Sequence, residues 1–141
     1  MRDAISALVR AVFWGSLTGG GPFLLLTIPI AITGVTDASA GEIVFVALMP
    51  ILIAGAVTAP AVIFLGLPLT ALLAYLGRET QGTYVAVGAG FGLLIATGLS
   101  QHLFGGWAGA FLALFGTAAG AAAAGTWGSW RERIADQQAH P

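Results

Sequence analysis

The sequence predicts an all-α polytopic membrane protein, in which a single four-helix transmembrane bundle takes up all 141 residues. Three stretches contain no Asp, Glu, Lys or Arg: residues 11–36, 43–77 and 80–130. About 20 apolar helical residues cross a hydrocarbon layer about 30 Å thick, and a charge at its centre costs about 2.5–3.5 kcal/mol. With 57% hydrophobic residues, 8% charged residues and a mean hydropathy of +0.92, the chain suits a lipid bilayer better than water.

The first crossing is predicted over residues 12–35. Arg10 and Trp14 lie at its start, where basic and aromatic side chains anchor a helix at the membrane interface. A Gly-Gly-Gly-Pro run at residues 19–22 interrupts the crossing, and Pro29 follows. Each proline lacks a backbone donor and clashes with the carbonyl four residues earlier. We therefore expect a kinked helix.

The stretch of residues 43–77 holds the second crossing. A straight helix of this length would be about 52 Å long, too long for one upright crossing and too short for two. Three prolines lie within the stretch: Pro50, Pro60 and Pro68. We predict one kinked crossing over residues 43–65, a break near Gly66–Pro68, and a short segment over residues 69–77 that protrudes or lies at the interface.

The stretch of residues 80–130 must hold two crossings, because a single helix of that length would extend about 75 Å. Its polar cluster at Ser100–Gly106 is expected to form the turn. The third crossing is then predicted at residues 83–99 and the fourth at residues 107–127. The polar tail, residues 131–141, is too short to be a domain and is predicted to be a frayed helix end.

Four crossings place every basic residue on one side of the membrane: Arg2, Arg10, Arg78, Arg131 and Arg133. The positive-inside rule then predicts a bacterial-type inner (cytoplasmic) membrane protein with both termini in the cytoplasm. The alternative is that residues 1–40 are a cleaved leader, because Ala38, Ser39 and Ala40 resemble a signal-peptidase site. The apolar segment before this motif is longer than an ordinary signal core, which favours the uncleaved form.

Small residues recur at every fourth position in the third and fourth crossings, and such ridges let helix backbones approach closely in lipid. The third crossing has one ridge: Gly88, Gly92, Ala96 and Ser100. The fourth has two neighbouring rows, one of Gly116, Gly120, Ala124 and Gly128, the other of Gly109, Ala113, Thr117, Ala121 and Gly125. We predict that the two helices pack as a hairpin. An interface with a second copy or another membrane subunit is the alternative, and two rows on one helix can serve both.

Composition excludes several kinds of site. The chain has no cysteine, so disulfides, thiolate nucleophiles and Cys-based metal sites are excluded. A net charge of −1 gives no electrostatic basis for binding nucleic acid. His102 is the single side chain between Glu79 and Arg131 that can change its charge near neutral pH. We interpret it as a hydrated loop residue; the alternative is an axial ligand to a haem or chlorin metal, with Gly98 leaving room on the same face. No cofactor and no metal are expected.

Two function classes fit these features. The first is a non-enzymatic structural or accessory subunit of a larger membrane complex or homo-oligomer, held by its small-residue ridges. The second is a small transporter or channel subunit that uses its proline-broken helices, since Pro60 frees the carbonyl of Ala56 and broken helices line sites in transporters. We predict no enzymatic activity, because no acid–base or nucleophile–base pair can be named within the membrane.

Overall fold

The computed structural model describes residues 2–33, 39–103 and 106–139, and its regular elements are all helical. They run in the order α1 (Arg2–Gly20), η1 (Gly21–Phe23), α2 (Leu24–Thr33), α3 (Ala40–Ala61), η2 (Val62–Gly66), α4 (Leu67–Tyr75), α5 (Gln81–Leu103) and α6 (Gly106–Ala139). The described part of the chain contains four helical stretches that are long and apolar enough to cross a membrane, judged by length and composition. The predicted all-α fold with four membrane helices is therefore confirmed.

Helix α1 begins at Arg2, before residue 12, where the first crossing is predicted to start. A short 3-10 turn, η1, joins α1 to α2 at the glycine–proline run. One glycine of this run is required by packing: a Cβ added at Gly20 would lie 2.6 Å from the carbonyl oxygen of Pro50 in α3. Gly20 therefore lets the backbones of the first two crossings touch.

The predicted break near Gly66–Pro68 is wrong. The backbone stays helical from Ala40 to Tyr75, and a five-residue π turn, η2, precedes Pro68. Pro68 has no N–H and would crowd the carbonyl of Phe64 in a regular helix. A π turn widens the helix at this point, so the chain accommodates the proline without a break. The segment expected to protrude or lie at the interface continues the helix as α4; its Leu73 is buried, while most of its other residues are exposed.

Capping signals define both ends of this helix. Ser39 and Glu42 form a capping box at the start, with the Ser39 N–H donating to Glu42 Oε2 at 2.8 Å. At the other end Gly77 adopts a positive φ of 62°, and the Arg78 N–H donates to the carbonyl of Leu73 at 3.0 Å. This is the Schellman arrangement that favours glycine. Ser39 thus has a structural role, while Ala38 of the leader-like motif lies outside the described residues.

The last two crossings are longer than predicted. Ser100 and His102 lie inside α5, so the turn begins later than the sequence suggested. The polar tail is helical as far as it is described: α6 continues through it to Ala139. Contacts with the start of α5 hold it, since Glu132 accepts a hydrogen bond from the Gln81 N–H at 3.0 Å.

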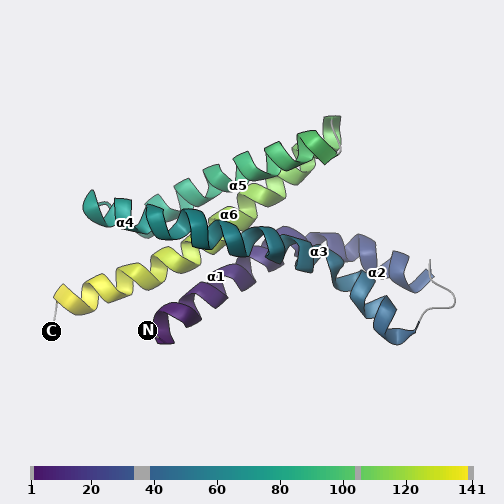
Figure 1. Cartoon of the computed structure of the whole chain (residues 1–141), viewed down its shortest axis with the longest axis horizontal. Helices are drawn as coiled ribbons and strands as arrows, with labels where there is room; N and C mark the ends of the chain where they lie inside the picture. Colours follow the sequence, from purple (N-terminus) through teal and green to yellow (C-terminus); the bar gives the residue numbers. More distant parts are fainter. Residues whose placement is uncertain (1, 34–38, 104–105, 140–141) are drawn as a thin grey trace.

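The helices pack unevenly. The start of α1, the end of α6 and the α4–α5 turn lie at one end of the molecule, and the end of α2, the start of α3 and the end of α5 lie at the other, where the α2–α3 pair and the α5–α6 pair diverge (Figure 1). Helix α6 packs along α5 and α1, and α1 packs along α3, whereas α3 and α5 are not packed against each other over the residues described. The buried cluster sits at the first of these ends and joins α1, α4, α5 and α6: Ala7, Ala11, Leu73, Tyr84 and Trp127.

Candidate functional site

The predicted ridge of α5 lies against α6 within the same chain. A Cβ added at Gly92 would overlap the carbonyl of Gly116, and one added at Gly88 would overlap the carbonyl of Gly120. The relation is reciprocal, because a Cβ on Gly116 would collide with Ala96. We call this contact the α5–α6 seam. Its close backbone approach is what small residues permit between membrane helices.

The seam extends along the whole ridge. Near the loop end, Ser100 is 1% exposed, and its Oγ would lie 3.0 Å from a Cβ added at Gly109. Ala113 is buried, and the methyl group of Ala124 would overlap a Cβ added at Gly88. The ridge residues therefore pack within the chain, and those of α5 also line one side of the groove described below.

His102 gives no support to a cofactor site. Its side chain is exposed near the end of α5, and the space beside Gly98 is open, with no atom within 4 Å of an added Cβ. Within the described ranges, no group of three or more His, Asp or Glu side chains is close enough to hold a metal ion.

A groove of about 660 Å³ opens between α3 and α5. Helix α3, η2 and α4 form one wall, α5 forms the other, and α1 and α6 form the floor. Its volume lies within the range of about 300–1,000 Å³ that is typical of ligand pockets. The groove exists because α3 packs on α1 while α5 packs on α6, which leaves the facing sides of α3 and α5 apart.

The groove is dry. None of the described residues that line it is charged. Of the hydroxyl groups in its lining, that of Thr58 has no hydrogen-bond partner among the described residues, and that of Tyr84 donates to Glu79. Thr27 donates to the carbonyl of Ala47 at 3.0 Å, and Ser100 donates to that of Thr97 at 2.9 Å. Hydroxyls used in this way offer little to a polar ligand. The lining therefore suits hydrocarbon.

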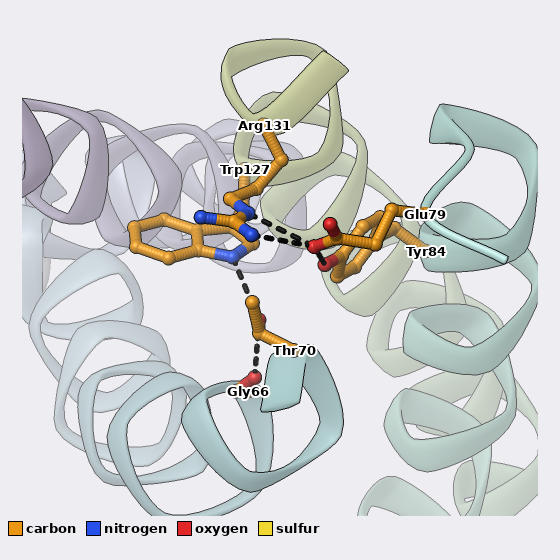
Figure 2. A network of polar contacts seen from close by, with 6 residues as sticks. All are labelled: Gly66, Thr70, Glu79, Tyr84, Trp127 and Arg131. Carbon is orange, nitrogen blue, oxygen red and sulfur yellow. Dashed lines mark hydrogen bonds and ion pairs between the residues drawn. The ribbon is translucent and has the colours of Figure 1, made fainter. Parts of the chain in front are cut away.

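A polar cluster closes the end of the groove that lies near the start of α1 and the end of α6; it consists of Thr70, Glu79, Tyr84, Trp127 and Arg131 (Figure 2). Arg131 donates from Nη2 and Nε to Glu79 Oε1, at 2.7 and 3.0 Å. The Tyr84 hydroxyl donates to the same oxygen at 3.1 Å. One carboxylate oxygen thus accepts three hydrogen bonds and ties the α4–α5 turn to α5 and α6.

The same cluster joins α6 to α4. Trp127 Nε1 donates to Thr70 Oγ1 at 2.9 Å, and that hydroxyl donates to the carbonyl of Gly66, the last residue of the π turn, at 2.8 Å (Figure 2). Trp127 and Tyr84 also line the groove. The cluster therefore connects the two sides of the groove at this end, and no comparable side-chain hydrogen bond links α3 to α5 in the parts of the chain described.

No local sequence pattern predicts this cluster. Arg131 and Glu79 are 52 positions apart and Trp127 and Thr70 are 57 apart, so no local pattern connects them. One signal was present: four crossings place Glu79 and Arg131 on the same side of the membrane. Opposite charges at the same membrane depth are candidates for pairing.

The groove offers an apolar binding surface, and its described residues form no recognisable catalytic group. The polar groups of the cluster bond to one another, and the groove contains no nucleophile with an adjacent base among the described residues. No known family matches this chain, and neither a curated protein nor a solved structure matches it significantly. The groove and the polar cluster are therefore the features of this chain that bear on its function.

Proposed function

We propose that this chain is a non-enzymatic membrane subunit that holds another hydrophobic membrane component in the groove between α3 and α5. The observation that carries the proposal is the groove itself: its lining is mainly apolar and uncharged, and it is flanked by two helices that do not pack on each other over the residues described. An accessory subunit of a larger membrane complex or homo-oligomer fits this description. The ridge of α5 packs against α6 and also lines the groove, so the groove as a whole, and not the ridge alone, is the proposed contact surface.

We also propose a bacterial-type inner membrane location with cytoplasmic termini. Arg78 lies in the α4–α5 turn, and Arg131 and Arg133 lie in the last part of α6. This turn and the end of α6 lie at the same end of the molecule as the start of α1 (Figure 1). The opposite end carries none of the five arginines in its connections. This asymmetry is the one that the positive-inside rule describes.

A small transporter is the second candidate, and the π turn favours it. Single π turns inside α-helices are frequent at functional sites, and η2 lies in the groove wall beside Pro60. Transport of a polar solute would require a polar path, whereas the lining is apolar. The groove thus fits a carrier of hydrophobic molecules better than a channel.

Photo-crosslinking in native membranes tests the proposal. The chain has no cysteine, so Ala61→Cys places a single benzophenone label in the groove. Ala56→Cys, on the exposed face of the same helix, is the matched control. We expect one dominant adduct from position 61 and a broad mixture of lipid adducts from position 56. The same mixture from both positions would show that nothing specific occupies the groove.

A further inference from the structure

We infer that α4 is a hinged gate at the end of the groove that lies near the start of α1 and the end of α6. It bends at the π turn η2, and the Trp127–Thr70 hydrogen bond holds it in the closed position seen in the structure. Leu67 and Leu69 of α4 line the groove, so a movement of α4 would open the groove at this end. The role as a gate rests on the proposed function, whereas the movement itself does not.

Packing alone holds α4 weakly. Over the residues described, its backbone runs close to that of η2, the turn before it, and is not packed along α1, α5 or α6. Of its nine residues Leu73 alone is buried, and Leu69 is partly buried against the same cluster. In lipid, apolar side chains gain little by exchanging acyl chains for a protein surface. The position of α4 therefore depends on few contacts, and hydrogen bonds carry much of its attachment.

The segment before α4 has the features of a bending point. The π turn Val62–Gly66 interrupts the regular α-helical pattern, and Pro68 supplies no N–H to the carbonyl of Phe64. Helices bend sharply at prolines and at π turns. A Cβ added at Gly66 would lie 3.7 Å from Val62 Cγ1, which is an ordinary contact, so packing does not require glycine here. What this glycine adds is backbone freedom.

A second flexible point lies beyond α4. Gly77 has a positive φ of 62° and separates α4 from Glu79, which pairs with Arg131 of α6. Helix α4 can therefore tilt between η2 and Gly77 while this ion pair stays formed. A bend of about 20° at Phe64 would move Ala74, which lies about 15 Å further along the helix, by about 5 Å.

One hydroxyl group joins the bending point to α6. Thr70 Oγ1 accepts a hydrogen bond from Trp127 Nε1 at 2.9 Å and donates to the carbonyl of Gly66 at 2.8 Å (Figure 2). The bond to Trp127 exists only while α4 lies beside α6, so it favours the closed position. Its loss should leave α4 free to tilt about η2.

Distances between two spin labels, measured by pulsed EPR on the full chain in vesicles, test the movement. The chain has no cysteine, so Ala74→Cys in α4 and Ala135→Cys in α6 carry the only two labels, and both positions are exposed. Ala86→Cys in α5 and Ala118→Cys in α6, which are also exposed, form the control pair across the α5–α6 seam. We expect one main distance from each pair in the parent.

Thr70→Val removes the acceptor of the Trp127 N–H. The α4 pair should then show a second distance, about 5 Å from the first, with the ratio of open to closed molecules raised about five- to tenfold. The control pair should not change. Thr117→Val, which removes a hydroxyl that bonds within α6, should leave both pairs as in the parent. Gly66→Ala added to Thr70→Val should lower the open fraction, because alanine stiffens the helix.

The outcomes separate the gate from the proposed function. An unchanged α4 distance in Thr70→Val shows that α4 is fixed and overturns the inference. Equal broadening of both pairs means that the whole bundle loosens, and no effect of Gly66→Ala places the bend outside η2; either result also overturns it. The crosslink expected from position 61 does not depend on these results, so the proposed function can stand without a gate. A moving α4 with no dominant adduct from position 61 keeps the movement and ends the proposed function.

Discussion

Single glycines decide how closely the helices approach. At Gly92 even one added carbon would overlap the carbonyl of Gly116, whereas a Cβ added at Gly90, two residues away, meets no atom within 4 Å. The two positions differ only in the face of α5 on which they lie. A sequence pattern of small residues at every fourth position can therefore locate a contact, while a neighbouring glycine outside the pattern has no such role.

Gly92→Leu should destabilise the protein strongly. Backbone atoms of α6 cannot move aside as a side chain can, so overpacking should cost at least about 1–3 kcal/mol. Thermal unfolding in detergent, followed by tryptophan fluorescence, measures the loss. Gly90→Leu is the control and should unfold near the temperature of the parent. Equal unfolding temperatures for Gly92→Leu and the parent would show that the seam is not closely packed.

Glu79→Gln should weaken the link between the α4–α5 turn and α6. The side chains of Arg131 and Glu79 are 28% and 22% exposed, so the burial of this ion pair is intermediate between that of a surface pair and that of a buried pair. We expect the free energy of unfolding to fall by about 1–2 kcal/mol. This is more than the about 0–1 kcal/mol that an exposed ion pair contributes and less than the about 3–5 kcal/mol lost when a fully buried pair is broken. The stability of the parent should fall as salt rises, while the variant should respond less. Asp136→Asn, an exposed change on the same helix as Arg131, is the control. It should leave the stability and its dependence on salt unchanged.

At the scale of the elements, most of the fold could be predicted and the errors have physical causes. Charge-free length located four membrane helices, because a charge in hydrocarbon is costly whatever the tertiary structure. Pro68 was misjudged because the effect of a proline depends on whether the helix can widen, and a π turn leaves no sequence pattern. The polar tail was misjudged because the contacts that hold it, through Glu79 and Gln81, come from a distant part of the chain.

Thr70→Val should loosen α4. The change preserves side-chain shape but leaves the nearly buried Trp127 N–H without its acceptor, which should cost about 1–3 kcal/mol. Thermal unfolding measures this loss. Thr117→Val is the control, because the Thr117 hydroxyl donates only to the carbonyl of Ala113 in its own helix. In the double variant with Trp127→Phe the two losses should not add; additive losses would mean that the hydrogen bond does not couple α4 to α6.

At the scale of the whole molecule, the chain forms two packed layers that stay apart on one side. Helices α1, α2 and α3 pack together, α5 and α6 form the seam, and α1 joins the two groups through α6. The sequence pattern predicts each helix and the α5–α6 contact. It could not show that α3 and α5 remain apart, because this depends on the directions in which the helices cross.

Reporter fusions test the proposed orientation of this arrangement. Fusions at Asp37, Gln81, His102 and Pro141 should report outside, inside, outside and inside, because four crossings separate the arginines from the two connections at the other end. Control fusions at Gly41 and Glu132 should agree with their neighbours at Asp37 and Pro141. An external signal from Gln81 or Pro141 would contradict the orientation.

Collision measurements on one spin label test most directly whether the groove is dry and open to lipid. Val57 lines the groove and is 37% exposed, so Val57→Cys carries a nitroxide into it. In vesicles, the label should collide often with oxygen, which concentrates in hydrocarbon, and rarely with a water-soluble nickel chelate. Frequent collision with the chelate would reveal an aqueous path and favour a channel. Rare collision with both reagents would mean that α3 and α5 close together, which contradicts the groove.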